Sequence, residues 1–325
     1  MNKNIKYSVI TPVYNREDCI MRCVKSVEKS IQAISVGGII EHVIVDDGSS
    51  DSTYSIVEKY AKTHPHVMPI RFENNKGTNA ARNEAIRRAS GEWCVLLDSD
   101  DYFCDTAFAD IDNTISNSPS FKHYTFASDD MQGYYRRNMV INGAKQKILS
   151  YPDFLNGYVN CDFVHVVQRE VLLRYPFDEQ LRIYEGLFFL LFYRDVRYVL
   201  FSNLTVTIRE RQRSDAVTRN LIRTNKKIIQ KKARSGELML DYFGKDMVQL
   251  GMWRRLRSVK LSLYENYVLL EEYSKAKSLQ ISNFIGWKER LLEVICVLKL
   301  GRYYRFALQS YLLLKYKMFR KKLKV

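Results

Sequence analysis

The first hundred residues alternate short apolar segments with amphipathic ones, and this alternation is the feature that most constrains the fold. Strands that alternate with helices of about a dozen residues form a parallel, doubly wound sheet. We expect Pro12 and Asn15 to end the first strand. The predicted strands are residues 7–11, 39–45, 67–72 and 93–97, and the predicted helices are 16–30, 51–61 and 77–90. Ligands of such an α/β fold bind at the carboxyl ends of the strands.

The length of 325 residues suits one large α/β domain with an appendage, or two domains. After the first hundred residues the pattern becomes mixed, and in the last third it contains helical stretches without convincing strands. A change in composition near residues 215–218 marks the boundary. We therefore expect an α/β domain over 1–218, with halves 1–104 and 105–218, and a helical, basic region over 219–325.

The net charge of +15 is concentrated in the last third of the chain. Residues 201–325 contain 28 basic and 10 acidic side chains, and no acidic residue follows Glu293. This distribution favours a polyanionic partner, either nucleic acid or an anionic membrane surface. The apolar share of 46% excludes wholesale disorder. The six cysteines form no CxxC pair and are typical of reduced thiols, and we expect neither a signal peptide nor a membrane-spanning segment.

An acidic cluster, Asp98-Ser99-Asp100-Asp101, directly follows the apolar segment WCVLL. Three carboxylates within four residues repel one another unless a cation shares them. Alternate positions of an extended segment point the same way, so Asp98 and Asp100 can converge on one centre. Oxygen ligands suit Mg²⁺ or Mn²⁺ whose other ligands are phosphate oxygens. The alternative is a solvated acidic loop that caps the following helix.

Two further segments lie where ligands of such a sheet would bind. Asp47 ends the second predicted strand, where its carboxylate can accept a hydrogen bond from a base N–H or a ribose hydroxyl. Residues 75–83 supply Gly77, several amides and Arg82 at a helix start, which favours an anion. Simple turn and helix-cap roles explain both segments equally well. Neither is a Walker A loop or a GxGxxG motif, which disfavours a P-loop or dinucleotide-binding fold.

Taken together, these segments resemble the family 2 glycosyltransferases of the GT-A fold. The segments that carry the resemblance are 8–15 (SVITPVYN), 43–53 (VIVDDGSSDST), 75–91 (NKGTNAARNEAIRRASG) and 95–101 (VLLDSDD). The resemblance implies a Rossmann-like, doubly wound and mostly parallel sheet. It also implies transfer of a sugar from a nucleotide diphosphate donor, with inversion at the anomeric carbon and with Mn²⁺ or Mg²⁺ as cofactor.

The resemblance also implies roles for individual residues. Pro12 and Tyr14 would line the base pocket, and Asp47 would hold a uracil or another base. Arg82 would lie near the donor, Asp98 near the ribose or sugar, and Asp100 on the metal. The metal neutralises the charge that develops on the leaving nucleoside diphosphate. The residues expected to bind the nucleotide sugar are Pro12, Tyr14, Asp47, Gly77, Arg82, Asp98 and Ser99.

The reaction also needs a base for the acceptor hydroxyl, and here the sequence departs from the family pattern. Family members usually carry Glu-Asp at the start of a helix in the acceptor half, whereas this chain has Glu185-Gly186. Glu185 is our candidate catalytic base. The alternatives are a base elsewhere, among Asp162, Asp178 and Glu179, or an acid that only stabilises the start of a helix.

Two basic segments complete the pattern. Residues 207–218 resemble the family's loop that closes over the donor pyrophosphate, and the alternative is a basic surface loop. Residues 299–325 interleave aromatic with basic side chains, and 294–325 hold nine basic residues and no acidic one. This mixture suits a helix in a membrane interface. Stacking on single-stranded nucleic acid and a solvated helix face are the alternatives.

We therefore expect a cytoplasmic glycosyltransferase, peripherally associated with the inner face of the cell membrane. It would pass a sugar from a UDP-sugar to a hydroxyl of a glycan or lipid-linked acceptor. The alternative from another class is a catalytically silent nucleotide-sugar-binding protein on the same fold, motivated by Gly186. A nucleic-acid-binding protein is less favoured, and no nucleic-acid partner is expected, because no segment resembles an RRM, KH or helix-turn-helix signature.

Overall fold

The computed structural model describes residues 5–32, 40–138, 145–159, 162–181, 184–210, 225–281 and 286–322. The side chains of 137–138 and 313–322 are outside this description. The chain divides into two compact units, Met1–Arg211 and Gln212–Val325. The predicted boundary near 215–218 lies outside the described residues.

One sheet organises the described part of the first unit. Its nine strands follow the order β3-β2-β1-β4-β8-β6-β9-β5, and β7 pairs with β9. The strands are β1 (Tyr7–Val13), β2 (Ile40–Asp46), β3 (Val67–Arg71), β4 (Trp93–Leu96), β5 (Tyr102–Phe103), β6 (His123–Ser128), β7 (Gln146–Ser150), β8 (Val164–Gln168) and β9 (Tyr198–Ile208). The helices are α1 (Ile20–Gln32), α2 (Thr53–Ala61), α3 (Thr78–Arg88), α4 (Ala107–Asn117), α5 (Gln132–Asn138), α6 (Tyr151–Leu155), α7 (Arg169–Arg174) and α8 (Glu185–Val196), with a 3₁₀ turn at Asp129–Met131.

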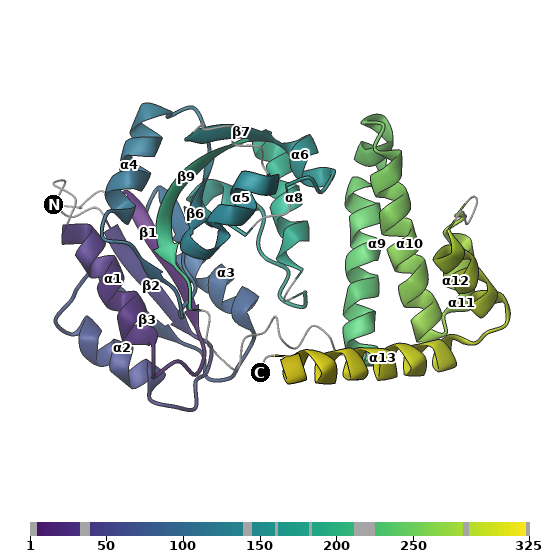
Figure 1. Ribbon diagram of the computed structural model, residues 1–325. Helices are drawn as coiled ribbons and strands as arrows, with labels where there is room; N and C mark the ends of the chain where they lie inside the picture. The colour runs from purple at the N-terminus through teal and green to yellow at the C-terminus, as the bar shows by residue number, and fades with distance from the viewer. Residues whose placement is uncertain are drawn as a thin grey trace. The chain divides into compact units, whose positions relative to one another are not determined.

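The four strands β3, β2, β1 and β4 form a parallel half-sheet. Every residue of β1 and β2 is buried, as expected for strands covered on both faces. Helices α1 and α2 lie together, and α3 packs against β1 and β2 (Figure 1). The connections from β1 to β2 and from β2 to β3 step across the sheet in one direction, whereas the connection from β3 to β4 steps back past β1. Because such crossovers are right-handed, α3 lies on the face of the sheet opposite to α1 and α2. The predicted α/β fold is confirmed.

The prediction that Pro12 ends the first strand is wrong. β1 continues to Val13, and Pro12 pairs with Val45 of β2. The pairing of β4 with β1 stops at Ile10, so no strand on that side requires the N–H group that proline lacks. Asn15 has the left-handed φ of 49° and turns the chain away from the strand.

The directions of the remaining strands bring several chain ends to one edge. β8 is antiparallel to both β4 and β6, and β6 is parallel to β9. The carboxyl ends of β1, β2, β4, β6 and β9 therefore share an edge of the sheet with the amino end of β8. The residues that follow these strands, and those that precede β8, are brought together there.

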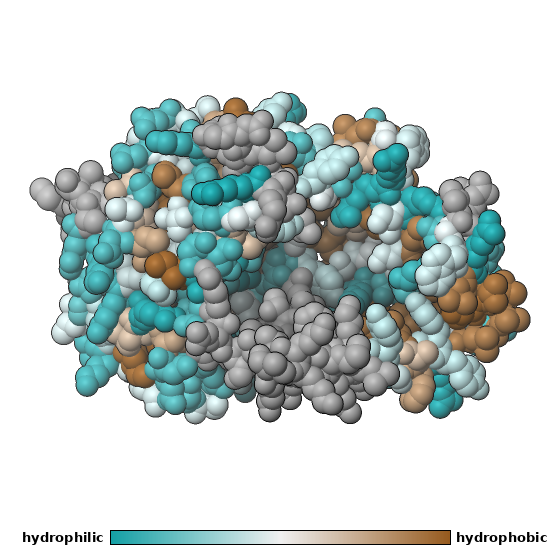
Figure 2. Space-filling view, viewed as in Figure 1, coloured by the Kyte–Doolittle hydropathy of each residue, from teal (hydrophilic) through white to brown (hydrophobic). Residues whose placement is uncertain are grey.

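The second unit is helical in its described part, which confirms the predicted helical C-terminal region. Its helices are α9 (Lys226–Gln249), α10 (Trp253–Leu270), α11 (Tyr273–Ser278), α12 (Trp287–Val297) and α13 (Gly301–Lys322). Leu263, Tyr267 and Val268 of α10 form the centre of its core. No helix within the described ranges is both long and apolar enough to cross a membrane. Figure 2 shows hydrophobic surface gathered over the part of this unit where Figure 1 places α12.

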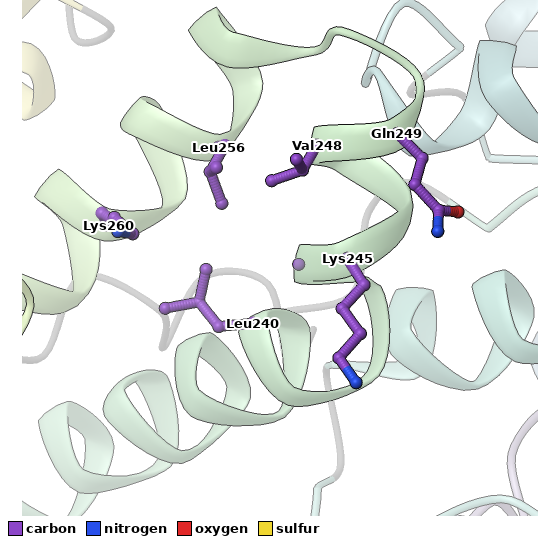
Figure 3. A pocket seen from close by; sticks show the side chains of 7 residues that line it. Leu240, Lys245, Val248, Gln249, Leu256 and Lys260 are labelled. Carbon is purple, nitrogen blue, oxygen red and sulfur yellow. The ribbon is translucent and has the colours of Figure 1, made fainter.

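An open cavity of about 450 Å³ lies between α9 and α10. Leu240, Val248 and Leu256 point toward one another around it (Figure 3). Gly244 also lines the cavity, and a Cβ atom added there would meet nothing within 4 Å. The missing side chain at Gly244 therefore contributes to the gap between the two helices.

We predict that Gly301→Ala destabilises the second unit. A Cβ at Gly301 would overlap the carbonyl oxygen of Val268 and lie 3.0 Å from the Tyr273 hydroxyl, so the start of α13 must shift away from α10. The expected loss is about 1–3 kcal/mol, in the range of overpacked cores. Thermal denaturation followed by far-UV circular dichroism measures it.

Gly244→Ala is the matched control. It replaces a glycine inside a helix of the same unit, where there is room for the added methyl group. We expect this variant to be more stable than the wild type by about 0.5–1 kcal/mol. Equal melting temperatures for the two variants would contradict the packing argument.

Candidate active site

The turn that follows β2 is fixed against the loop before α3. The backbone N–H groups of Lys76 and Gly77 donate to the buried Asp47 carboxylate at 2.7 and 2.9 Å. Gly48 has φ of +72°, and a Cβ there would lie 2.8 Å from the carbonyl carbon of Asn74. Asp47 therefore positions the Gly77 loop, a role that the sequence analysis missed.

A second buried acid, Asp46, supports the same turn. Its Oδ1 accepts hydrogen bonds from the Ser49 N–H at 3.2 Å and from the Ser49 hydroxyl, and the Nε of Arg71 lies 3.5 Å from its Oδ2. Burial raises the pKa of the Asp46 carboxyl, although Ser49 and Arg71 oppose the shift. The Asn15 N–H donates to the Ser49 hydroxyl oxygen at 2.9 Å. The ends of β1 and β2 are thus bound to each other.

The three predicted base-pocket residues lie at these strand ends. Pro12 and Asp47 are buried, whereas Tyr14 is 42% exposed. Tyr14 is thus the member of this group whose side chain is open to a ligand.

Arg82 of α3 connects the acidic cluster to Glu185. Its Nη2 donates to Asp98 Oδ1 at 2.6 Å, and its Nη1 lies 3.8 Å from Glu185 Oε1. The guanidinium carbon also lies 5.6 Å from the centre of the Phe177 ring. Burial acts to lower the pKa of Arg82, but Asp98, Glu185 and Asp162 raise it above its usual value. Predicted residues from both halves of the first unit therefore meet at one guanidinium.

Two asparagines of α3 hold the loop that leads to Glu185. The Asn83 side chain donates to the Phe177 carbonyl at 2.9 Å and accepts from the Phe177 N–H at 2.9 Å. The Asn79 side chain donates to the Asp178 carbonyl at 2.8 Å. Glu179, one of the alternative bases, accepts from Asn83 at 3.2 Å. This loop is therefore docked on the helix that carries Arg82, and Glu185 follows it as the first residue of α8.

The acidic cluster after β4 has the oxygen chemistry of a divalent-metal site. The Asp98 side chain is 56% exposed, Ser99 is buried, and Asp100 Oδ2 lies 3.9 Å from Arg16 Nη2. Burial and the negative charges of Asp98 and Asp100 raise the pKa of Asp101 to about 8. A cation beside Asp98 and Asp100 would relieve this repulsion, so these residues fit Mg²⁺ or Mn²⁺. Within the described residues, no three His, Cys, Asp or Glu side chains are arranged to hold a metal ion by themselves. A metal bound by Asp98 and Asp100 would therefore need oxygen atoms of the substrate as further ligands.

A second arginine, Arg209, gathers acids from other strands at the same edge. Its Nη1 donates to Asp162 Oδ2 at 2.7 Å, and its Nε lies 3.8 Å from Asp101 Oδ2 and 3.9 Å from Asp130 Oδ1. Its backbone N–H donates to Asp129 Oδ1 at 3.0 Å. Burial opposes the charge, but these carboxylates raise the pKa of Arg209 above its usual value.

Asp129 and Asp130 were not predicted from the sequence to belong to the site. They directly follow β6, which is the same signal that singled out Asp98 after β4. Of the loop predicted over residues 207–218, the structure describes only the part to Glu210. The Glu210 N–H donates to Asp101 Oδ1 at 3.2 Å, and the Glu210 carboxylate accepts from Arg22 at 2.8 Å. The described start of the loop is thus bound to the acidic cluster.

The family model "Glycosyl transferase family 2" matches residues 8–175 of the chain. The matched region contains the turn after β2, α3 and the acidic cluster, but it ends before Glu185. The family resemblance predicted from the sequence is confirmed.

The curated relatives include a glucosyltransferase and a teichoic acid biosynthesis protein. Poly(ribitol-phosphate) beta-glucosyltransferase of Bacillus spizizenii is 39% identical over 99 residues, which are 30% of this chain and 15% of that protein. The minor teichoic acid biosynthesis protein GgaA of Bacillus subtilis is 26% identical over 278 residues, which are 80% of this chain and 60% of that protein. The chain thus spans less than two thirds of the length of either relative.

Solved structures share the fold. The crystal structure of Staphylococcus aureus TarS 1–349 has a TM-score of 0.59 and 17% identity, and the match covers 94% of this chain and 91% of that one. The mannosyltransferase PcManGT of Pyrobaculum calidifontis, in complex with GDP-Man and Mn²⁺, has a TM-score of 0.56 and 18% identity, and covers 95% and 85%. The predicted GT-A fold is confirmed.

We predict that Asn83→Ala destabilises the first unit by roughly 2–3 kcal/mol, because it leaves the buried N–H and carbonyl of Phe177 unpaired. Urea denaturation measures the change. Asn79→Ala is the matched control four residues earlier on α3. It removes one hydrogen bond together with an Oδ1 that has no partner among the described residues. We expect a smaller loss there, and an equal or larger one would contradict the role assigned to Asn83.

Proposed function

The chain belongs to glycosyl transferase family 2, and on this basis we propose that it transfers a sugar from a UDP-sugar to a hydroxyl of a glycan or lipid-linked acceptor. In this proposal the catalytic role belongs to the domain predicted over residues 1–218. The observation that carries the proposal is the position of Arg82, with Asp98 at 2.6 Å and Glu185 at 3.8 Å. A donor-side acid and a candidate base are within reach of the same guanidinium.

The donor would bind at the carboxyl ends of β1, β2 and β4. Tyr14 and Pro12 would line the base pocket, with Asp47 beside the base. The structures of S. aureus TarS with UDP and with UDP-GlcNAc support UDP as the nucleotide. The Mn²⁺ in the PcManGT complex supports a divalent metal.

Asp98 and Asp100 would hold Mn²⁺ or Mg²⁺. The metal would supply charge neutralisation for the departing nucleoside diphosphate. Arg82 keeps its positive charge beside Asp98, so it offsets negative charge on the same side of the site.

Glu185 would accept the proton of the acceptor hydroxyl, and attack from the side opposite the nucleotide would invert the anomeric carbon. Its carboxylate lies at the first turn of α8, where the helix dipole favours a negative charge. Arg82 Nη1 lies 3.8 Å from the Glu185 Oε1 atom.

One observation favours the second candidate, a silent nucleotide-sugar-binding protein. Gly186 stands where the family usually has the aspartate base. A Cβ at this position would meet nothing within 4 Å, so contacts of a Cβ atom do not explain the glycine.

We further propose that the protein works in surface-polysaccharide synthesis at the cytoplasmic face of the cell membrane. The names of GgaA and of the putative teichuronic acid biosynthesis glycosyltransferase TuaG support the first part. The basic C-terminal region supports contact with anionic lipid.

The donor site is tested by Asp100→Asn, which removes charge but little volume. We expect UDP with Mn²⁺ to raise the melting temperature of the wild type, since a ligand that binds only the native state stabilises it. In Asp100→Asn this Mn²⁺-dependent increase should be lost. Asp105→Asn, an exposed acid five residues on, is the control and should respond like the wild type. A wild-type response from Asp100→Asn would refute the metal assignment.

The base is tested by Glu185→Gln in an assay of UDP-sugar hydrolysis, where water replaces the acceptor hydroxyl. We expect turnover to fall by about 10²–10⁴-fold, the usual contribution of base catalysis, while UDP binding stays unchanged. Glu179→Gln is the control for a nearby acid and should retain most activity.

Gly186→Asp separates the two candidate functions. If the wild type hydrolyses no UDP-sugar but Gly186→Asp does, the silent-protein reading is correct. Wild-type turnover in Glu185→Gln would instead assign the base to another acid.

A further inference from the structure

Helix α12 has two apolar faces. One face packs into the core of the second unit through Leu292, Ile295 and Cys296. The other face is exposed and carries Trp287 (80%), Leu291 (46%), Val294 (50%) and Leu298 (60%), the last of these directly after the helix. Spacings of four, three and four residues place these side chains on one stripe. Because the inward face already supplies the packing of the helix, the outward stripe has no role in the core.

The start of α13 adds two exposed aromatic side chains next to this stripe in the sequence. The Tyr304 hydroxyl donates to Glu265 Oε1 at 2.6 Å, and Arg305 lies 2.9 Å from Glu271, so α13 is bound to α10 and to the turn after it. Tyr303 and Phe306 remain 72% and 71% exposed. The junction of α12 and α13 is therefore a folded surface rather than a loose tail. Hydrophobic surface over α12 is visible in Figure 2.

The charged residues around the stripe are mainly basic. Lys288, Arg290, Lys299 and Arg302 are exposed, and Glu293 is the last acid of the chain. The cores of protein–protein interfaces are depleted in lysine. Helices that lie in a membrane interface combine Trp, Phe and Leu on one face with Lys and Arg around it. The composition of this surface matches the second case.

We propose that α12 and the first two turns of α13 lie in the surface of an anionic bilayer. The stripe Trp287, Leu291, Val294 and Leu298 would face the acyl chains, and the flanking cations would contact lipid phosphates. This rests on the membrane association proposed above and assigns it to a folded surface that begins at Trp287, twelve residues before the aromatic and basic segment 299–325. The occupant is the lipid surface itself.

The experiment is flotation of the full chain with vesicles of phosphatidylcholine, with or without phosphatidylglycerol. We expect binding only to the vesicles that contain phosphatidylglycerol. The double variant Trp287→Ser with Leu298→Ser should lower partitioning by about tenfold or more, since it removes two apolar side chains from the contact. Lys299→Gln with Arg302→Gln should lower it by roughly fivefold for each cation removed.

Trp253→Ser is the matched control. Trp253 is a tryptophan of the same unit, 61% exposed at the start of α10 and outside the stripe. It should leave partitioning unchanged. An effect as large as that of the stripe variant, or equal binding to vesicles without phosphatidylglycerol, would overturn the proposal.

The hydrolysis assay and a mass measurement separate the remaining outcomes. UDP-sugar hydrolysis should be the same in all these variants, so a wild type that floats but does not hydrolyse contradicts the proposed function and supports the lipid contact. A wild type that hydrolyses but does not float contradicts the lipid contact alone. If it also forms dimers that Trp287→Ser dissociates, the stripe is an interface between copies of this chain.

Discussion

The structure of the first unit depends on balancing the carboxylates that its strands deliver to one edge. Parallel strands end there with acids after β2, β4 and β6, and β8 begins there after Asp162. Two arginines pair with the acids after β4, after β6 and before β8. Arg82 comes from α3 and Arg209 from the end of β9, more than a hundred residues apart in sequence. The acceptor half is joined to the donor half by the pairing of β8 with β4 and of β9 with β5, and the ion pairs of Arg82 with Glu185 and of Arg209 with Asp101 add to that attachment.

The two arginines leave their acids in different states. The Asp98 side chain remains 56% exposed beside Arg82, whereas the Asp101 side chain is 16% exposed beside Arg209. Burial and repulsion raise the pKa of Asp101 to about 8, which shows that its charge is disfavoured. Asp98 keeps an open side toward solvent. Asp101 therefore has mainly a structural role, and its neighbours Asp98 and Asp100 are the acids proposed to bind a ligand.

Local patterns in the sequence were enough for the parallel half of the sheet and for the motifs at its edge. They were not enough for roles that depend on distant contacts. Asp47 accepts hydrogen bonds from the N–H groups of Lys76 and Gly77. From the sequence alone, an aspartate that binds a base cannot be told apart from one that caps a loop. Asn83 looked like an ordinary helix residue because its partner Phe177 lies 94 residues away. Likewise, the periodicity of α12 gives two apolar faces and does not say which one is core.

The two units meet opposite electrostatic demands by different means. The acidic edge of the first unit is paired internally with Arg82 and Arg209, and Asp98 and Asp100 are the proposed site of one further cation. The second unit has 26 basic and 9 acidic side chains, a net charge of +17 that no pairing within it can remove. Such a surplus repels itself and is retained only at a cost in stability. An external anion lowers that cost, and the exposed apolar stripe of α12 favours an anion presented on an apolar surface. A lipid bilayer provides both.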